Sequence, residues 1–582
     1  MADVVIKNGL LVDGTGAPPR RADIAITGEH ITEVAEPGQL SGTNDGATMI
    51  DADGLAVTPG WIDVHTHYDG QATWDPVLAP SATNGVTSIV MGNCGVGFAP
   101  ARPDRHEWLI GLLEGVEDIP GAALAEGLTW DWESFPEYLD ALARLPRSID
   151  IAAQMPHSAL RTYVLGDRGA DPTEAASADE ITQMAKLMDE ALAAGAVGFT
   201  TSRTILHRTK ANKPIPTLQA NIEELVGITD PLRTRRAGVM QMISDAYLSA
   251  EPEHAAAELA VLGALARQTR RPLSFTVQQP NHVPDRWREL FTAIRGWNAE
   301  GFDVKAQVGV RPIGTLLGHT ASLNPFFFTP TYRSLLRLSL DERLAALRTT
   351  EVRAKILEEH PLHVPPGTPG ALANGFFNMY PLGDPPSYEP DPSTSIAATA
   401  KSRGIDVVEY LYDLLMTNEG RDLLYCPINN YSYTNLNDVR EMMTFEYALF
   451  GLSDAGAHCN FICDGTMPTT AISHWTRDRP SDKLPIEFVV HGQTQRIARH
   501  IGWTDRGAVT PGLLADINVI DLDRLQLRAP RLVADLPAGG TRLMQKAEGY
   551  VATIKRGAVT FRDGEHTGAL PGQVVRGTSS PM

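Results

Sequence analysis

The chain has 582 residues, of which 43% are hydrophobic and 21% charged, an ordinary balance for a globular protein. Its formal net charge of −20 argues against nucleic acid or an anionic membrane as a partner. Four cysteines are too few for a disulfide framework, and no apolar run approaches the ~20 residues that span a bilayer. The N-terminus does not resemble a signal peptide, so we expect a cytoplasmic protein of two or three domains.

Short strands are predicted at both ends of the chain. In residues 1–58, strand-like runs such as Val4–Ile6 and Ile24–Ile26 are separated by turn residues. Similar runs recur near the C-terminus at Ala515–Ile520 and Tyr550–Lys555. We therefore predict a small β-sandwich domain built from residues 1–58 and 507–582.

The middle of the chain, residues 59–506, alternates strands with helices. Strands are predicted over Thr87–Met91, Ile149–Ala153 and Ala196–Phe199. Between the last two, Ala176–Ala194 has apolar residues at helical spacing, and Gly195 is a typical C-terminal stop. Repeated β-α units predict a parallel sheet with both faces covered, and in a chain this long a (β/α)8 TIM-like barrel is the leading α/β fold.

Residues 312–395 interrupt this alternation. They are rich in Pro, Phe and Tyr and contain a charged helical stretch, Leu340–Glu359. We interpret them as an insertion over the mouth of the barrel. Its aromatic residues can line an acyl pocket, act as a lid or form a small core of their own: Phe326, Phe327, Phe328, Tyr332, Phe376, Phe377 and Tyr380.

Two histidines follow the apolar strand predicted at Val57–Val64. His65 and His67 are two residues apart, so on an extended chain both side chains point to the same side. Two imidazoles at the carboxyl end of a barrel strand are well placed to bind a divalent metal. The alternative is a pair of surface histidines in a turn, but the surrounding sequence PGWIDVHTH favours the metal site.

This segment resembles the opening metal motif of the amidohydrolase superfamily, and in particular of the D-aminoacylase (N-acyl-D-amino-acid deacylase) family. Further segments resemble that family in the same order along nearly the whole chain. They are Met91–Pro100 (its GNCG segment), His157–Arg161 (its GHGxLR stretch, with Pro156 where Gly is usual), Gly195–Ser202 (its GAxGxSS strand end), Leu452–Asp454 (its final SD) and Asp505–Asp516 (its DRGxxxPGxxAD return).

The resemblance implies roles for four residues. His65, His67 and Asp454 would form the first metal site, and Asp454 would also accept a proton from the attacking water. Cys94 would be a thiolate ligand. It follows an apolar strand within a Gly-rich loop, which permits close approach to a metal, although a lone cysteine is more often a buried inert thiol.

The sequence departs from the family pattern at the second metal. Relatives use two more histidines there, and the corresponding stretches, Gly238–Asp245 and Pro272–Gln278, contain none. Amide side chains are poor zinc ligands compared with imidazole. We therefore expect one zinc ion and a weakened or absent second site.

Five further residues are candidates for substrate binding. His157, His207 and His458 can each be a metal ligand, a donor to substrate or a hydrogen-bonded loop residue. Arg203 and Arg311 follow predicted strands and suit a substrate carboxylate, but either can equally form a surface salt bridge.

Three functions compete. The first is hydrolysis of the amide bond of an N-acyl-D-amino acid or related small molecule by metal-activated water. The second is opening of a cyclic amide or ureide, or cleavage of an ester or lactone, on the same scaffold. The third is a non-catalytic homologue, which the joint retention of His65, His67, Cys94 and Asp454 disfavours. The sequence leaves open whether the chain forms a homo-oligomer.

Overall fold

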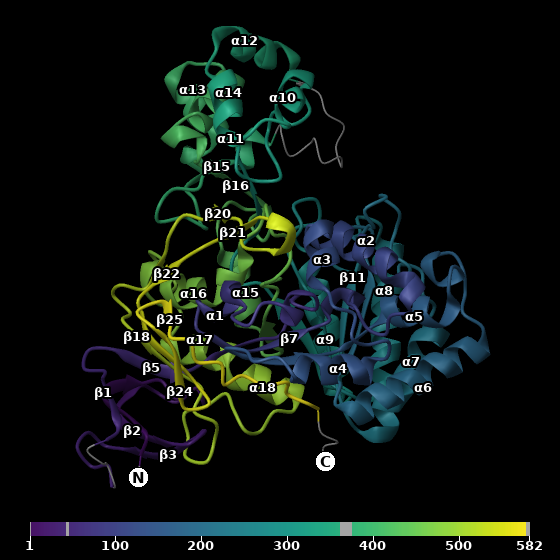
Figure 1. The fold of residues 1–582 in the computed structure, drawn as a ribbon, viewed down its shortest axis with the longest axis vertical. Coiled ribbons are helices and arrows are strands. Elements are labelled where there is room, and N and C mark those ends of the chain that lie inside the picture. The colour runs from purple at the N-terminus through teal and green to yellow at the C-terminus, as the bar shows by residue number, and fades with distance from the viewer. Residues whose placement is uncertain (1, 42–45, 361–374, 578–582) are drawn as a thin grey trace.

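Both ends of the chain meet in one nine-stranded sheet of the computed structural model, which describes residues 2–41, 46–360 and 375–577 (Figure 1). A C-terminal strand, β18 (Ile517–Ile520), joins the two ends because it pairs antiparallel with an N-terminal strand on one side and a C-terminal strand on the other. The other strands are β1 (Val4–Leu11), β2 (Arg20–Thr27), β3 (His30–Ala35), β4 (Thr48–Asp51), β5 (Ala56–Pro59), β23 (Tyr550–Lys555), β24 (Ala558–Arg562) and β25 (Glu565–His566).

The middle of the chain contributes two parallel sheets, which confirms the predicted α/β class. The first is β6 (Trp61–Asp63), β7 (Val86–Met91) and β8 (Asp150–Ala153). The second has the order β17 (Ala448–Phe450), β13 (Val304–Val308), β12 (Leu273–Thr276), β11 (Val239–Ser244), β10 (Gly198–Arg203) and β9 (Met155–Pro156). Nearly all of their residues are buried, as expected where both faces of a sheet are covered.

The strand predicted over Val57–Val64 is divided between two sheets. β5 lies in the nine-stranded sheet and β6 in a parallel sheet, with Gly60 between them. The amide of Gly60 donates to the carbonyl of Asp516, just before β18 of the nine-stranded sheet. The next amide, that of Trp61, donates to the carbonyl of Gly85, just before β7 of the parallel sheet. The prediction of one strand was wrong because hydropathy reports burial and does not report which sheet supplies the hydrogen bonds.

Helices connect the parallel strands. The helix predicted over Ala176–Ala194 is confirmed as α6 (Ala178–Ala194): Ser177 and Glu180 form a capping box, and Gly195 ends it with φ of 110°. The others in this part of the fold are α1 (Ala79–Ala82), α2 (His106–Glu117), α3 (Gly121–Gly127), α4 (Phe135–Ala143), α5 (His157–Leu165), α7 (Ile222–Arg235), α8 (Pro252–Thr269), α9 (Arg286–Ala299), α15 (Asn437–Met443), α16 (Met467–Ile472), α17 (Ile486–Gln493) and α18 (Gln495–Ile501).

A separate lobe stands away from the rest of the molecule at the top of Figure 1. It has its own apolar core, which runs from Leu317 to Cys426 and so continues past residue 395, the predicted end of the insertion. Residues 361–374 lie outside the described residues. The lobe comprises β14 (Ile313–Leu317), α10 (Pro330–Leu335), α11 (Leu340–Leu347), α12 (Thr350–Glu359), β15 (Tyr380–Pro381), α13 (Ile396–Arg403), α14 (Val407–Leu415) and β16 (Leu424–Asn429).

A segment of the C-terminal part, which we call the C-terminal excursion, lies outside the nine-stranded sheet. Its four short strands pair as β19 (Gln526–Leu527) with β22 (Ala547–Glu548) and β20 (Arg531–Val533) with β21 (Arg542–Met544). Residues of this excursion belong to the same apolar core as the parallel strands. Among the described helices, none combines the length and apolar character needed to cross a membrane.

Candidate metal centre

His65 and His67 lie just beyond the carboxyl end of β6. Both side chains are buried, and their ring centroids are 5.4 Å apart at an interplanar angle of 63°. The Asp63 carboxylate accepts a hydrogen bond of 3.1 Å from the His65 amide and thereby fixes the turn after the strand. The pair therefore occupies the end of the strand where parallel α/β proteins place their chemistry.

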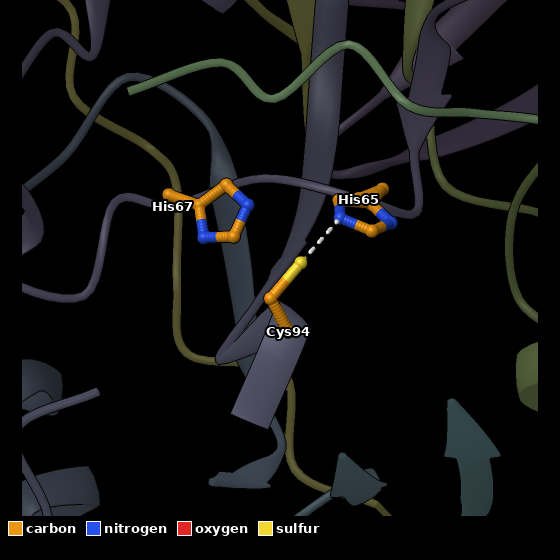
Figure 2. A group of neighbouring side chains, drawn as sticks. All are labelled: His65, His67 and Cys94. Atoms are coloured by element: carbon orange, nitrogen blue, oxygen red, sulfur yellow. Dashed lines mark hydrogen bonds between the residues drawn. The ribbon is translucent and has the colours of Figure 1, made fainter. Parts of the chain in front are cut away.

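Cys94 faces His65 from the loop after the neighbouring strand, β7 (Figure 2). Its Sγ lies 3.3 Å from His65 Nε2. Cys94 has a left-handed backbone with φ of 56°, and Gly92 and Gly95 beside it also have positive φ. Such strained conformations persist where the surroundings hold them, often at functional sites. Burial raises the pKa of the thiol to about 12, so a bound cation is needed to make it a thiolate near neutral pH.

Asp454 lies between the two imidazoles. Its Oδ1 is 3.2 Å from His65 Nε2 and 3.4 Å from His67 Nε2. Burial raises the pKa of Asp454, but the charges of His65 and His67 and a hydrogen bond from His67 outweigh burial and hold the pKa below its usual range. Its side chain is 20% exposed, so an ionised carboxylate at this position contacts solvent.

Two residues that the sequence did not suggest contact the outer nitrogens of these imidazoles. Gln307 Oε1 on β13 is 2.7 Å from His65 Nδ1. Glu117, the last residue of α2, places Oε1 3.3 Å from His67 Nδ1. Burial raises the pKa of Glu117 to about 7. No local signal marks either residue, because a glutamate at a helix end and a glutamine on a strand are common.

The donor set fits a divalent metal ion. His65, His67 and Cys94 each offer a ligand atom, and these atoms lie within 4.8 Å of one another. The Asp454 carboxylate is next to both imidazoles. Two imidazoles, a sulfur and a carboxylate are ligands that zinc accepts. The geometry thus brings together the four residues predicted as metal ligands.

The stretches expected to carry a second metal contain buried amide and hydroxyl groups. Gln241 on β11 is 1% exposed, and neither polar atom of its side chain has a hydrogen-bond partner among the described residues. Ser274, its lateral neighbour on β12, accepts a hydrogen bond of 3.0 Å from Gln307 Nε2. Neither is a preferred zinc ligand, in keeping with the expectation of a weakened second site.

His207 and His458 lie near the metal centre. The His458 amide donates to Glu117 O at 2.5 Å, and its Nε2 is 4.0 Å from Glu117 Oε2. His207 Nδ1 is 2.9 Å from Ser202 Oγ. Burial, with a smaller contribution from the charge of His67, lowers the pKa of His207 to about 3 and that of His458 to about 4. Both imidazoles are therefore neutral near pH 7.

The other three predicted substrate-binding residues are engaged elsewhere. His157 is buried, with Nδ1 2.8 Å from Thr201 Oγ1 and Nε2 3.0 Å from Glu224 Oε1. Arg203 pairs with Glu258 at 2.6 Å. Arg311 is also buried and is held by Asp464, Thr470 and the Cys463 carbonyl, each at 2.9 Å. The structure does not bring these three to the metal centre, and a substrate role for each stays a prediction.

A small pocket opens beside Asp454. One wall is the loop after β17, including Cys459 and Ile462, and the other is the C-terminal excursion, including Arg542 and Gln545. The two walls are joined by a hydrogen bond of 2.6 Å from the Leu543 amide to the Cys459 carbonyl. This C-terminal stretch falls within residues 507–582, predicted as part of the β-sandwich domain, and nothing in its sequence indicated a contribution to the pocket.

A parallel α/β fold that gathers two histidines, a cysteine and an aspartate at the carboxyl ends of its strands is typical of metal-dependent hydrolases. Comparison with known proteins gives the family. Residues 48–561 match the model of the Amidohydrolase family. The D-aminoacylase of Alcaligenes xylosoxydans xylosoxydans is 33% identical over 588 aligned positions, which cover 99% of this chain and 98% of the relative. The chain belongs to the amidohydrolase family.

Other relatives agree with this assignment. The N-acyl-D-glutamate deacylase of Alcaligenes xylosoxydans xylosoxydans is 37% identical over 203 residues, which are 34% of this chain and 37% of that protein. A structure of D-aminoacylase described by its binuclear metal centre aligns with a TM-score of 0.65 at 24% identity, covering 99% of this chain and all of the other. The N-acyl-D-glutamate deacylase of Bordetella bronchiseptica, solved with zinc and a phosphonate inhibitor, gives 0.63 at 23%, covering 99% of each. The two structures support the fold.

Proposed function

We propose that this amidohydrolase cleaves the amide bond of an N-acyl-D-amino acid and uses one zinc ion held by His65, His67, Cys94 and Asp454. The observation that carries the proposal is the convergence of ligand atoms from His65, His67 and Cys94 within 4.8 Å, with the Asp454 carboxylate beside both imidazoles. The names of the curated relatives support the substrate class, because they are a D-aminoacylase and an N-acyl-D-glutamate deacylase.

The fold that would hold this site is a closed (β/α)8 barrel. A parallel bridge between Thr66 and Ala455 joins the loops after β6 and β17, which end the two parallel sheets. The sheets also meet where β8 and β9 are separated by Gln154 alone. These two junctions support closure. The β-sandwich and the domain limits at 58 and 507 stay predictions, as do a cytoplasmic location and a homo-oligomer.

Asp454 is the group we assign to proton transfer. Its carboxylate is ionised, lines the pocket and is partly open to it. When bound, a zinc ion would supply Lewis-acid chemistry that lowers the pKa of water and polarises the scissile carbonyl. Asp454 then accepts the proton of the attacking water and passes it to the leaving nitrogen.

The pocket beside Asp454 is where we place the substrate. Its wall combines apolar groups, such as Ile462 and Leu543, with the polar side chains of Gln71 and Gln545. Such a mixture suits a small molecule with both an acyl chain and polar ends. His458 has a buried Nδ1 without a hydrogen-bond partner among the described residues, but it does not line this pocket, and its role in substrate binding stays a prediction.

Metal content and a substrate panel test the proposal. We expect the purified protein to contain about one zinc per chain and to hydrolyse N-acyl-D-amino acids faster than their L-enantiomers. The panel should include cyclic amides, ureides, esters and lactones. A folded protein that holds no metal and gains no activity with added zinc would refute metal-dependent hydrolysis. Turnover of a cyclic amide or ureide, without turnover of any N-acyl-D-amino acid, would refute the deacylase assignment in favour of a cyclic-amide hydrolase.

Replacing Asp454 by asparagine tests its role in proton transfer. Since an amide cannot act as a base, we expect kcat for D454N to fall by about 10²- to 10⁴-fold. D478N is the matched control, because Asp478 is partly exposed and pairs with the adjacent Arg477. Steady-state kinetics with zinc-saturated proteins makes the comparison. Equal kcat values for D454N and wild type would show that Asp454 does not transfer the proton.

A further inference from the structure

Glu117 lies close to two of the three segments that carry the metal ligands. Its side chain is 2% exposed, and Oε1 is 3.3 Å from His67 Nδ1. Neither atom meets hydrogen-bond geometry with any described residue, the other included, so the pair is an ion-pair contact at 3.3 Å with no competing partner. The Glu117 carbonyl accepts the His458 amide at 2.5 Å, which fixes the end of α2 to the loop after Asp454.

His65 shows what such a contact does. Gln307 donates from Nε2 to Ser274 Oγ at 3.0 Å, which turns its amide oxygen toward His65. That oxygen is 2.7 Å from His65 Nδ1, so this nitrogen carries the ring proton. The other nitrogen, Nε2, then presents its lone pair to Cys94 Sγ at 3.3 Å and to Asp454 Oδ1 at 3.2 Å. The amide thus orients His65 as a ligand.

We propose that Glu117 is a positioning residue that orients His67 in the same way, with its carboxylate on Nδ1–H and the Nε2 lone pair directed at the metal. The inference rests on the metal-dependent function proposed above. His67 Nε2 is 3.4 Å from Asp454 Oδ1, on the inner side of the centre. A carboxylate behind a ligating imidazole fixes the tautomer and raises ligand basicity.

Gln307, which contacts His65, and Glu117, which contacts His67, differ in charge. Gln307 is neutral, whereas Glu117 beside a bound dication would be ionised and would add a negative charge to a buried centre that already contains Asp454. A dication compensates this charge, so Glu117 favours metal binding both through the orientation of His67 and through electrostatics. Glu117 contacts Nδ1 of His67, whereas Asp454 lies at the other ring nitrogen, Nε2, which places Glu117 behind His67 and not on the metal.

Titration of the metal-free protein with Co²⁺ tests the inference without measuring activity. The variants are E117Q and the matched control E114Q, since Glu114 lies on the same helix and pairs at 2.8 Å with the exposed Lys210. Chelator competition gives the affinity, and visible absorption reports the ligand set. We expect E117Q to bind Co²⁺ about 10- to 100-fold more weakly than wild type and E114Q, with unchanged absorption bands at saturation.

Each other outcome has a defined meaning. Wild-type affinity in E117Q overturns the inference. Altered bands at saturation also overturn it, because they would make Glu117 a direct ligand. A wild-type protein that binds no Co²⁺ or zinc refutes the proposed function itself, and the inference falls with it. If E117Q does not fold, E117D replaces it: this variant keeps the charge but shortens the reach, so it should bind Co²⁺ more weakly, and unchanged affinity would overturn the inference.

Discussion

At the scale of single residues, Glu224 shows how buried charges far from the metal ligands are stabilised. His157 Nε2 lies 3.0 Å from its Oε1, and Arg161 Nη1 lies 2.6 Å from both oxygens. Burial raises the pKa of Glu224, but the hydrogen bonds and charges of His157 and Arg161 outweigh burial and lower the pKa to about 2. This network accounts for Nε2 of His157, and Thr201 Oγ1 accounts for Nδ1.

E224Q should therefore be destabilised in a pH-dependent way. At pH 7 we expect a loss of about 3–5 kcal/mol, because Arg161 is left as an unpaired buried charge. The folded-state pKa is below the unfolded value of ~4.3, so the carboxylate stabilises the fold above pH ~4.3 and this contribution disappears as the pH falls toward 2. The stability gap between wild type and E224Q should then narrow by about 3 kcal/mol.

Urea unfolding at pH 7 and near pH 3 measures this gap, and about half of the narrowing, ~1.7 kcal/mol, should be present at pH 3. The control is E223Q, because Glu223 is the exposed preceding residue in the same helical turn. We expect E223Q to stay within about 0.5 kcal/mol of wild type. A gap of the same size at both pH values would contradict a depressed pKa of Glu224.

At the scale of elements, Gly60 allows the chain to pass from the nine-stranded sheet into the parallel sheet. A Cβ at this position would overlap the side chain of Thr87 on β7. The turn therefore needs glycine for close packing of the two strands and not for an unusual φ. Since β6 leads directly to His65, the packing at Gly60 also sets the position of the first ligand.

G60A should be destabilised by about 1–3 kcal/mol, because the added methyl group has no space. The matched control is G296A: a Cβ at Gly296 in α9 meets no atom within 4 Å, and alanine is the better helix former. We expect G296A to gain about 0.5–1 kcal/mol. Thermal unfolding of both variants gives the comparison, and equal stability of G60A and wild type would show that Thr87 can move aside.

At the scale of the whole molecule, a buried charge network connects the nine-stranded sheet to the parallel sheet. Lys555, the last residue of β23, places Nζ 2.9 Å from Asp150 Oδ2 on β8 and 2.7 Å from Asp516 Oδ2. Burial raises the pKa of Asp150, but the charges of Lys555, Arg506 and Arg556 outweigh burial and hold the pKa below its usual range. The network ties the chain ends to the part that carries the site.

K555M should lose about 3–5 kcal/mol of stability, because two buried carboxylates lose their shared cation. K7M is the control, since Lys7 is exposed on β1 of the same sheet. Chemical denaturation at neutral pH measures both. A K555M protein as stable as K7M would mean that Arg506 and Arg556 suffice to compensate Asp150.

The sequence by itself determined the family, the parallel α/β class and the end of α6. These depend on local or ordered signals: apolar alternation, helical spacing that ends at a glycine, and motifs met in order along the chain. The four predicted ligands, His65, His67, Cys94 and Asp454, also came from such motifs, and the fold brings them together.

Only the tertiary structure decided which side chains surround these four. Glu117, Gln307 and Arg542 lie on three elements distant in sequence, and packing alone places them beside the ligands or the pocket. Packing likewise decided that Arg203 and Arg311 meet carboxylates within the fold. A buried polar group takes the partner that the fold supplies, and no local pattern in the sequence records that partner.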